Sequence, residues 1–169
     1  MPSTADDLAL IARQEQTLHL LNFDADTAWQ LGSLLHELAV TRHHSLVIDI
    51  RRFGTPDQQL FFAATPGTTP DNSRWVQRKI NAVARLHRSS YALGLALAES
   101  GRSFSDRYNL PEADYATHGG CFPLHVTGAG ILGAVTISGL PQRDDHNLAV
   151  EALCLLLHLD PATLLLPPL

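Results

Sequence analysis

The stretch TPDNSRWVQRKINAVARLHRSS, residues 69–90, predicts a central amphipathic helix on which the rest of the chain is organised. Thr69 can cap this helix, Pro70 suits its first position, and Asp71 complements the positive end of its dipole. Its apolar stripe recurs at helical spacing and comprises Trp75, Val76, Ile80, Ala82, Val83, Leu86 and His87. Because Lys79 is the only lysine of the chain, it stands out as a candidate functional residue.

The composition is that of a globular protein with few charges. A length of 169 residues predicts a single domain spanning 1–169. Charged residues make up 17%, and a net charge of −5 argues against a nucleic-acid-binding or anionic-membrane-binding protein. Neither cysteine lies in a C-x-x-C pair, and no apolar run approaches the ~18 residues of a membrane span. We therefore expect a reduced, soluble, cytoplasmic protein.

The remaining segments predict an α/β domain of the α+β type, with a five-stranded, mainly antiparallel sheet covered by helices. Further helices are expected at 3–16, 24–41, 91–100 and 142–159, and strands at 17–21, 45–51, 60–64, 121–126 and 131–137. The second and third strands, and the fourth and fifth, read as hairpins. Residues 102–115 read as irregular with a turn at 111–114, and the apolar, proline-broken tail 160–169 reads as a docked arm.

Four segments carry a resemblance to a known family: DNSRWVQRK at 71–79, HRSS at 87–90, HGGCFPLHV at 118–126, and GAVTISGLPQRDDHNLAVEAL at 133–153. They resemble the uncharacterised-protein branch of the haem-degrading-domain family, which also contains extracellular haem-binding sensors and GlcG-like proteins. The strongest marks are the Gly119-Gly120 strand entry and the segment ending at Ser138-Gly139.

The resemblance covers about residues 18–157 and implies a profilin-like sheet and ring-shaped or stacked oligomers. It also implies haem as a candidate ligand, since the family is named for haem binding or breakdown by some members. An apolar tail and a sparsely charged surface favour an oligomer as well, at least a dimer.

On the central helix, Trp75, Arg78 and Lys79 form the first part of a candidate ligand site. Lys79 reads either as an anion partner or imine-forming amine, or as a lysine whose stem lies along the helix flank. Arg78 is expected to lower the pKa of Lys79. The helix arginines Arg78, Arg85 and Arg88 could hold a ligand carboxylate or pair with acidic residues across a subunit interface.

Two histidines near the helix and the fourth strand are further candidates. His87 falls on the apolar stripe, where a core histidine is the commoner outcome. His118 precedes Gly119 and Gly120, which free the backbone around it, although adjacent glycines often serve only close packing. A His118–Cys121 pair suggests metal or thiolate chemistry, but in the family small residues often replace this cysteine, which argues against a cysteine mechanism.

The turn before the last helix supplies the remaining candidates. Ser138 and Gly139 could present free backbone N–H groups to a carboxylate or phosphate, or form a plain turn. Asp144, Asp145 and His146 could add acid–base or metal chemistry, although acidic residues are common in a first helical turn and this ligand cluster is short. In the second strand, Asp49 reads as an arginine partner rather than a catalytic group. We expect no metal site, because the nine histidines are scattered.

Three functions remain open from the sequence. The first is an oligomeric protein that binds haem or another anionic, carboxylated small molecule. The second is an enzyme acting on a small carboxylate or carbonyl compound through Lys79 or His118. The third is a structural or partner-binding module. The sequence lacks a triad, a Walker loop, a zinc signature and a dinucleotide fingerprint, so it does not decide between enzyme and binding protein.

Overall fold

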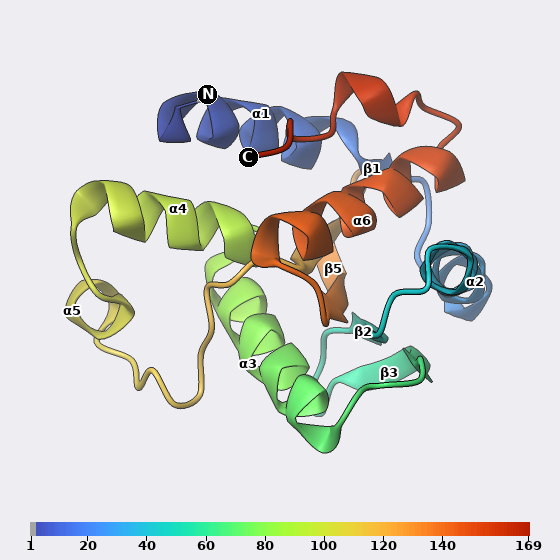
Figure 1. Ribbon diagram of the computed structural model, residues 1–169, viewed down its shortest axis with the longest axis horizontal. Coiled ribbons are helices and arrows are strands. Elements are labelled where there is room, and N and C mark those ends of the chain that lie inside the picture. Colours follow the sequence, from blue (N-terminus) through green and yellow to red (C-terminus); the bar gives the residue numbers. More distant parts are fainter. Residues whose placement is uncertain (1–2) are drawn as a thin grey trace.

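The computed structural model describes residues 3–169, and its centre is a five-stranded sheet enclosed by helices (Figure 1). The strands are β1 (His19–Leu20), β2 (Val47–Arg52), β3 (Gln58–Ala64), β4 (Cys121–Val126) and β5 (Gly130–Ser138), in the spatial order β1-β4-β5-β2-β3. Both predicted hairpins, β2–β3 and β4–β5, are antiparallel, while β1 pairs with β4 in parallel. The predicted fold class is confirmed.

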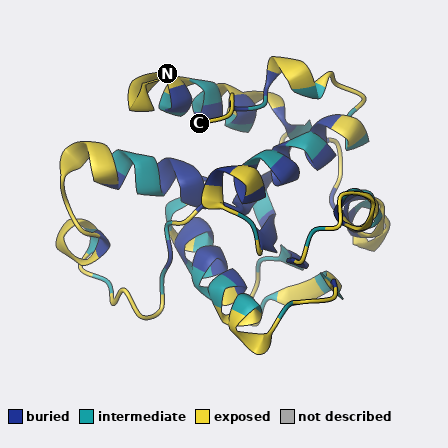
Figure 2. Ribbon diagram, in the orientation of Figure 1, coloured by how far each residue is buried: buried dark blue, intermediate teal, exposed yellow. Residues whose placement is uncertain are grey.

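Side chains of the sheet alternate between two helical layers. Ile48 and Ile50 of β2 belong to the main core with α2 (Ala25–Thr41) and α6 (Gln142–Leu156). Val47 points to the opposite face, where it packs with the apolar side of α3 (Pro70–Leu86). Figure 2 shows the buried side of α3 and α6 turned towards the interior. Strand β2 is thus buried on both faces, which explains its apolar run.

The central helix ends earlier than the stretch 69–90 indicates. His87 adopts a left-handed conformation, with φ 56°, and its N–H donates to the Val83 carbonyl. Ser89 then caps α4 (Ser90–Ser100) through its hydroxyl, which accepts from the Ala92 N–H. At the other end, the Asn72 side-chain oxygen accepts from the Thr69 N–H at 2.9 Å and fixes the start of α3.

The predicted docked arm is confirmed. The chain makes a short 3-10 turn, Pro161–Thr163, and then lies against α1 (Thr4–Thr17) and α6, with Leu164 and Leu166 buried. The Gln14 amide donates to the Leu164 carbonyl at 2.7 Å, and the Asn147 side chain bonds both backbone groups of Leu166. Two leucines of the apolar tail that favoured an oligomer are therefore buried within their own subunit and are not available for an interface.

Element boundaries differ from the prediction in three places. The segment 102–115 contains a short helix, α5 (Phe104–Tyr108), which Ser103 caps and Phe104 anchors in the interior. The last helix ends at Leu156 rather than near 159, and the first strand is two residues long. The predicted turn at 111–114 is present, with the Asp114 N–H bonded to the Pro111 carbonyl.

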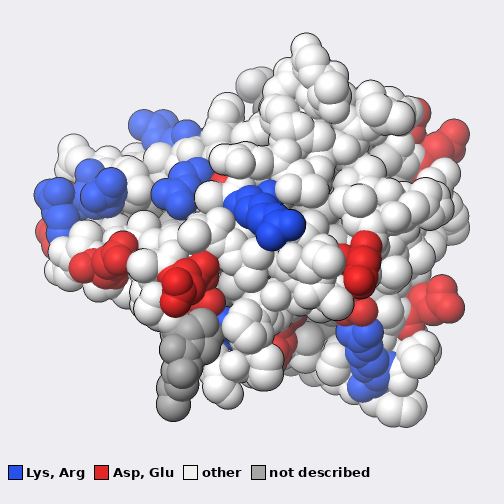
Figure 3. Space-filling view, turned by 90° about the horizontal axis from the view of Figure 1, so that it is seen from above, with Lys and Arg blue, Asp and Glu red and all other residues white. Residues whose placement is uncertain are grey.

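Charge is sparse on the face shown in Figure 3, where acidic and basic side chains form a few separate groups on a mostly uncharged surface. Among the helices of residues 3–169, none combines the length and apolar character needed to cross a membrane.

Candidate functional site

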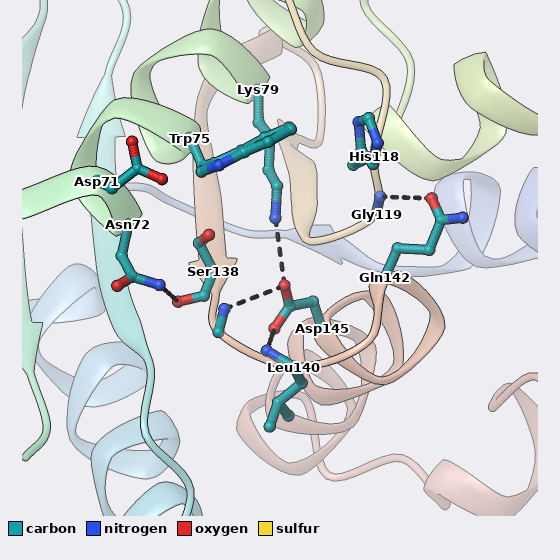
Figure 4. A pocket seen from close by; sticks show the side chains of 11 residues that line it. Asp71, Asn72, Trp75, Lys79, His118, Gly119, Ser138, Leu140, Gln142 and Asp145 are labelled. Carbon is teal, nitrogen blue, oxygen red and sulfur yellow. Dashed lines mark hydrogen bonds and ion pairs between the residues drawn. The ribbon is translucent and has the colours of Figure 1, made fainter. Parts of the chain in front are cut away.

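A pocket of about 280 Å³ opens between α3, the loop before β4 and the turn from β5 to α6 (Figure 4). The turn is held there because β5 lies in the middle of the sheet and delivers Ser138 beneath the first turns of α3. The pocket is lined by Asp71, Asn72, Trp75, Lys79, His118, Gly119, Ser138, Gly139, Leu140, Gln142 and Asp145.

Lys79 forms the floor of this pocket. Its side chain is only 3% exposed, and its ammonium donates to the Ile137 carbonyl at 2.9 Å and to Asp145 Oδ2 at 3.2 Å. An ammonium has three N–H donors, so these two acceptors leave one donor for a ligand. Lys79 is therefore not a lysine that lies along the helix flank with its charge in solvent.

Burial shifts both members of the Lys79–Asp145 pair towards their neutral forms. Desolvation lowers the pKa of Lys79, opposed by the charge of Asp145 and by the hydrogen bond to it. Desolvation also raises the pKa of Asp145, opposed by Lys79 and by the backbone N–H groups of Leu140 and Gly139. The pKa of Lys79 moves in the predicted direction, but the cause is burial and not Arg78.

Gly120 makes room for the lysine amine. A Cβ at position 120 would lie 2.8 Å from Lys79 Nζ and would collide with the Ile137 carbonyl, and the backbone there has φ +123°. A side chain at this position would displace the amine from its acceptors. Gly120 thus shapes the site from behind, although it is not among the residues that line the pocket.

The turn at Ser138 and Gly139 does not offer the free N–H groups that the sequence suggested. Asp145 Oδ2 accepts from the Gly139 N–H at 3.3 Å, and Oδ1 accepts from the Leu140 N–H at 3.0 Å. The carboxylate expected at this turn is therefore the protein's own. Asp145 links the turn to Lys79 and holds the floor of the pocket together.

Aromatic rings form one wall of the pocket. Trp75 and His118 meet edge to face with ring centroids 4.9 Å apart, and the Arg78 guanidinium lies 4.6 Å from the Trp75 ring centroid. Arg78 donates to the carbonyls of Glu112 and Tyr115, so it supports the wall and does not line the pocket. Partial burial, then Lys79 and Arg78, lower the pKa of His118, which favours the neutral imidazole.

Two of the candidate histidines lie elsewhere. His87 is exposed at the end of α3 and borders a separate cavity of about 370 Å³ with His19 and His125. His146 is fully buried, where its Nε2 bonds Gln14 Oε1 at 2.8 Å and its pKa falls to about 3 through desolvation. Consecutive residues of a helix point in different directions. The Asp145 side chain therefore lines the pocket, whereas the His146 side chain points away from it.

The burial and hydrogen-bond partners of Cys121 and Asp49 indicate the role of each residue. Cys121 is fully buried, and desolvation raises its pKa to about 12, so the thiolate needed for nucleophilic chemistry is disfavoured. The expectation against a cysteine mechanism agrees with this burial. Asp49 accepts two hydrogen bonds from Arg51 and one from the Gln59 amide, as expected for an arginine partner.

Sequence reasoning brought Trp75, Lys79, His118, Gly119, Ser138 and Gly139 to this pocket but missed the polar residues Asp71, Asn72 and Gln142. Two of them contact the pocket backbone. Asn72 donates to the Ser138 carbonyl at 3.4 Å, and Gln142 accepts from the Gly119 N–H at 3.4 Å. Their position in the first turns of α3 and α6 was the available signal, because helix starts often border pockets. Across the part of the chain described, no group of three or more His, Cys, Asp or Glu side chains has metal-binding geometry.

Comparison with known proteins places the chain among relatives that match most of its length. A family described as "Haem degrading protein HbpS-like" matches residues 23–154. A UPF0303 protein of Acidobacterium capsulatum is 59% identical over 165 residues, with 98% of each chain covered. A UPF0303 protein of Burkholderia thailandensis is 57% identical over 148 residues, 88% of each chain.

Solved structures share the same arrangement. The crystal structure of Ybr137w protein has 25% identity and a TM-score of 0.81, covering 88% of this chain and 87% of that one. HbpS has 18% identity and a TM-score of 0.60, covering 82% and 90%. A structure titled PduOC:Heme Complex has 18% identity and a TM-score of 0.65, covering 78% and 93%. At this low identity, the last two comparisons show the fold alone.

Proposed function

Because the chain belongs to the family of HbpS-like haem-degrading proteins, we propose that it is a small-molecule-binding protein whose ligand occupies the Lys79 pocket. The observation that carries the proposal is the lysine itself. A buried ammonium with one remaining donor is unfavourable unless something polar completes it. A ligand oxygen at that point would supply the third acceptor.

The walls favour a compact, flat molecule. The Trp75 and His118 rings offer an aromatic surface, while the Asn72 and Gln142 side chains offer amide groups at the edge. Lys79 is already balanced by Asp145, and Asp71 adds a second carboxylate at the rim. The pocket therefore favours a ligand with a carbonyl oxygen or a single carboxylate over a polyanion.

We infer that haem would extend beyond this pocket. The pocket volume of about 280 Å³ lies just below the range of small-molecule sites, roughly 300–1,000 Å³. Arg78, a candidate for a haem propionate, is engaged with two backbone carbonyls and the Trp75 ring. We expect haem titrated into the purified protein to give an additive spectrum, and a saturable Soret shift lost in His118→Ala would overturn this restriction.

We propose further that the protein forms a homo-oligomer. With Leu164 and Leu166 buried in their own subunit, the support comes from other apolar side chains. Trp29 on α2 is 66% exposed and Phe62 on the edge strand β3 is 47% exposed. Light scattering of the wild-type protein at micromolar concentration should give a mass above 18.4 kDa, and a monomer mass would reject the oligomer.

Tryptophan fluorescence can test the pocket directly. The chain has two tryptophans, so Trp29→Phe leaves Trp75 as the reporter in the pocket wall. In this background we expect one of three planar probes, pyruvate, benzoate or nicotinamide, to change the emission saturably. Lys79→Arg should abolish the response because the bulkier guanidinium does not fit the acceptors of a compact amine.

Arg85→Lys serves as the matched control, because Arg85 is exposed on the same helix and lies outside the pocket. It should bind the probe as the parent does. If Lys79→Arg retains binding while it separates the subunits, Lys79 belongs to an interface and the pocket proposal is wrong.

A further inference from the structure

We propose that Lys79 reacts covalently with its ligand, forming an imine with the carbonyl carbon of a small aldehyde or ketone. This inference rests on the proposed function, because the ligand must first enter the pocket. It names the ligand class: a compact carbonyl compound, with or without one carboxylate.

The geometry isolates one reactive amine in a suitable place. Lys79 is the only lysine, and the other eleven basic residues are arginines, which do not form imines at neutral pH. Its amine lies at the floor of a pocket, is 3% exposed, and is held by two acceptors and by the lack of a side chain at Gly120. An attacking nitrogen is thus positioned and shielded from bulk water.

Asp145 is placed to move the proton that the reaction requires. Its Oδ2 lies 3.2 Å from Lys79 Nζ. Burial disfavours both charges, lowering the pKa of Lys79 and raising that of Asp145, so transfer of a proton from the ammonium to the carboxylate is assisted. The result is the neutral amine that attacks a carbonyl.

The remaining steps balance without an oxidant or reductant. The neutral amine adds to the carbonyl carbon, a C–N bond forms, and a proton passes from nitrogen to the former carbonyl oxygen to give a carbinolamine. Asp145 then returns its proton to the hydroxyl group, which leaves as water as the C=N bond forms. The net reaction consumes the Lys79 ammonium and one carbonyl compound and produces one protonated imine and one water, with Asp145 ionised before and after.

Reductive trapping in an Arg85→Lys background tests the proposal within one molecule. The substitution places an ordinary exposed lysine on the same helix, at position 85 and outside the pocket, as an internal competitor. The folded protein is incubated at pH 7 with pyruvate or propanal and sodium cyanoborohydride, which reduces an imine to a stable secondary amine. Peptide mapping by mass spectrometry then gives the labelling rate at each position.

We expect Lys79 to be labelled about tenfold faster than the lysine introduced at position 85, because its amine is positioned at the pocket floor and burial favours its neutral form. Preference should vanish in denaturant, where both amines are equivalent. Equal or slower labelling of Lys79 in the folded protein would overturn the imine.

Two further measurements test the role of Asp145 and distinguish failure of the imine proposal from failure of the proposed ligand binding. Asp145→Asn should slow trapping at Lys79, because the group that takes up and returns the proton is lost, and should leave the introduced lysine unchanged. An unchanged or faster rate at Lys79 would reject the role of Asp145. If pyruvate changes Trp75 emission but leaves Lys79 unlabelled, the pocket binds ligands without covalent chemistry. In that outcome the imine is rejected and the proposed function survives.

Discussion

Two buried ion pairs in this molecule differ in how completely they are satisfied. Arg143 donates two short hydrogen bonds to Asp7, at 2.7 and 2.9 Å, and a third to the Pro167 carbonyl at 2.7 Å. The Lys79–Asp145 pair has one contact at 3.2 Å. The first pair joins α1, α6 and the arm, while the second borders a pocket.

The pKa shifts of the two cations follow from this difference. The hydrogen bond to Asp7 raises the pKa of Arg143, whereas burial lowers that of Lys79. The bidentate hydrogen bonds of the Arg143 guanidinium compensate for its lost hydration, whereas the Lys79 ammonium, with one carboxylate contact and one carbonyl contact, is compensated only in part. The Asp7–Arg143 pair therefore holds the N-terminal helix and the C-terminal arm together. In the Lys79–Asp145 pair, burial favours transfer of a proton from the lysine to the aspartate.

The largest expected effect on stability is at the Asp7–Arg143 pair. Asp7→Asn should lower the free energy of unfolding by about 3–5 kcal/mol, because it leaves the Arg143 guanidinium buried without its anion. Guanidinium chloride unfolding at pH 7 measures the change. Asp6→Asn, on the exposed side of the same helix, is the control and should cost much less. Equal costs for the two variants would contradict the contrast between the pairs.

A smaller effect is expected at the pocket pair. Lys79→Met should cost about 2 kcal/mol at pH 7, because Asp145 keeps two backbone donors and can accept a proton. Removing the lysine raises the pKa of Asp145 further. The native state then binds a proton that the unfolded state has released, so this variant should gain stability as the pH falls from 7 towards 4.

Urea unfolding across that pH range checks the sign. The double variant Lys79→Met with Asp145→Asn should lose this pH dependence, since the titrating carboxyl is gone. A single variant whose stability only falls on acidification would show that Asp145 stays ionised.

The smallest effect on stability is expected at His146, near the Asp7–Arg143 pair. Its pKa of about 3 in the folded protein lies below the usual value of 6.5, so the unfolded state binds the proton first. Stability should therefore fall as the pH drops from about 6.5 towards 3. His146→Gln keeps a donor for Gln14 but does not titrate, and should remove roughly 0.7 kcal/mol of the loss between pH 7 and 6, measured by thermal unfolding. An unchanged pH profile would contradict the buried, neutral histidine.

Local sequence signals predicted most helices and strands, because the formation of these elements depends largely on neighbouring residues. Pro70 fixed the start of the central helix, and the alternation around Ile48 and Ile50 fixed a strand buried by helices. The short helix α5 was missed, since five residues carry too little periodicity and its stability depends on Phe104 packing inside. The end of α3 at His87 was also missed, because a left-handed histidine lacks the glycine that usually signals it.

The candidate site was predicted in part for a similar reason. Lys79 stood out by composition and His118 by its glycines, and both lie at the pocket. The partner of Lys79 is 66 residues away and could not be chosen from sequence, because Asp144 and Asp145 look equivalent until the fold buries one. The same information was needed to see that His146 faces α1.

The docked arm changes how the two ends of the chain should open. The first helix and the arm lie side by side (Figure 1), and the Gln14–Leu164 bond joins residues 150 positions apart. Ends usually fray independently and exchange their amide hydrogens early. Here the Leu166 amide bonds to Asn147 while α1 packs against the arm, so neither can open without exposing the other. The first helix and the arm should therefore exchange hydrogen as one cooperative unit.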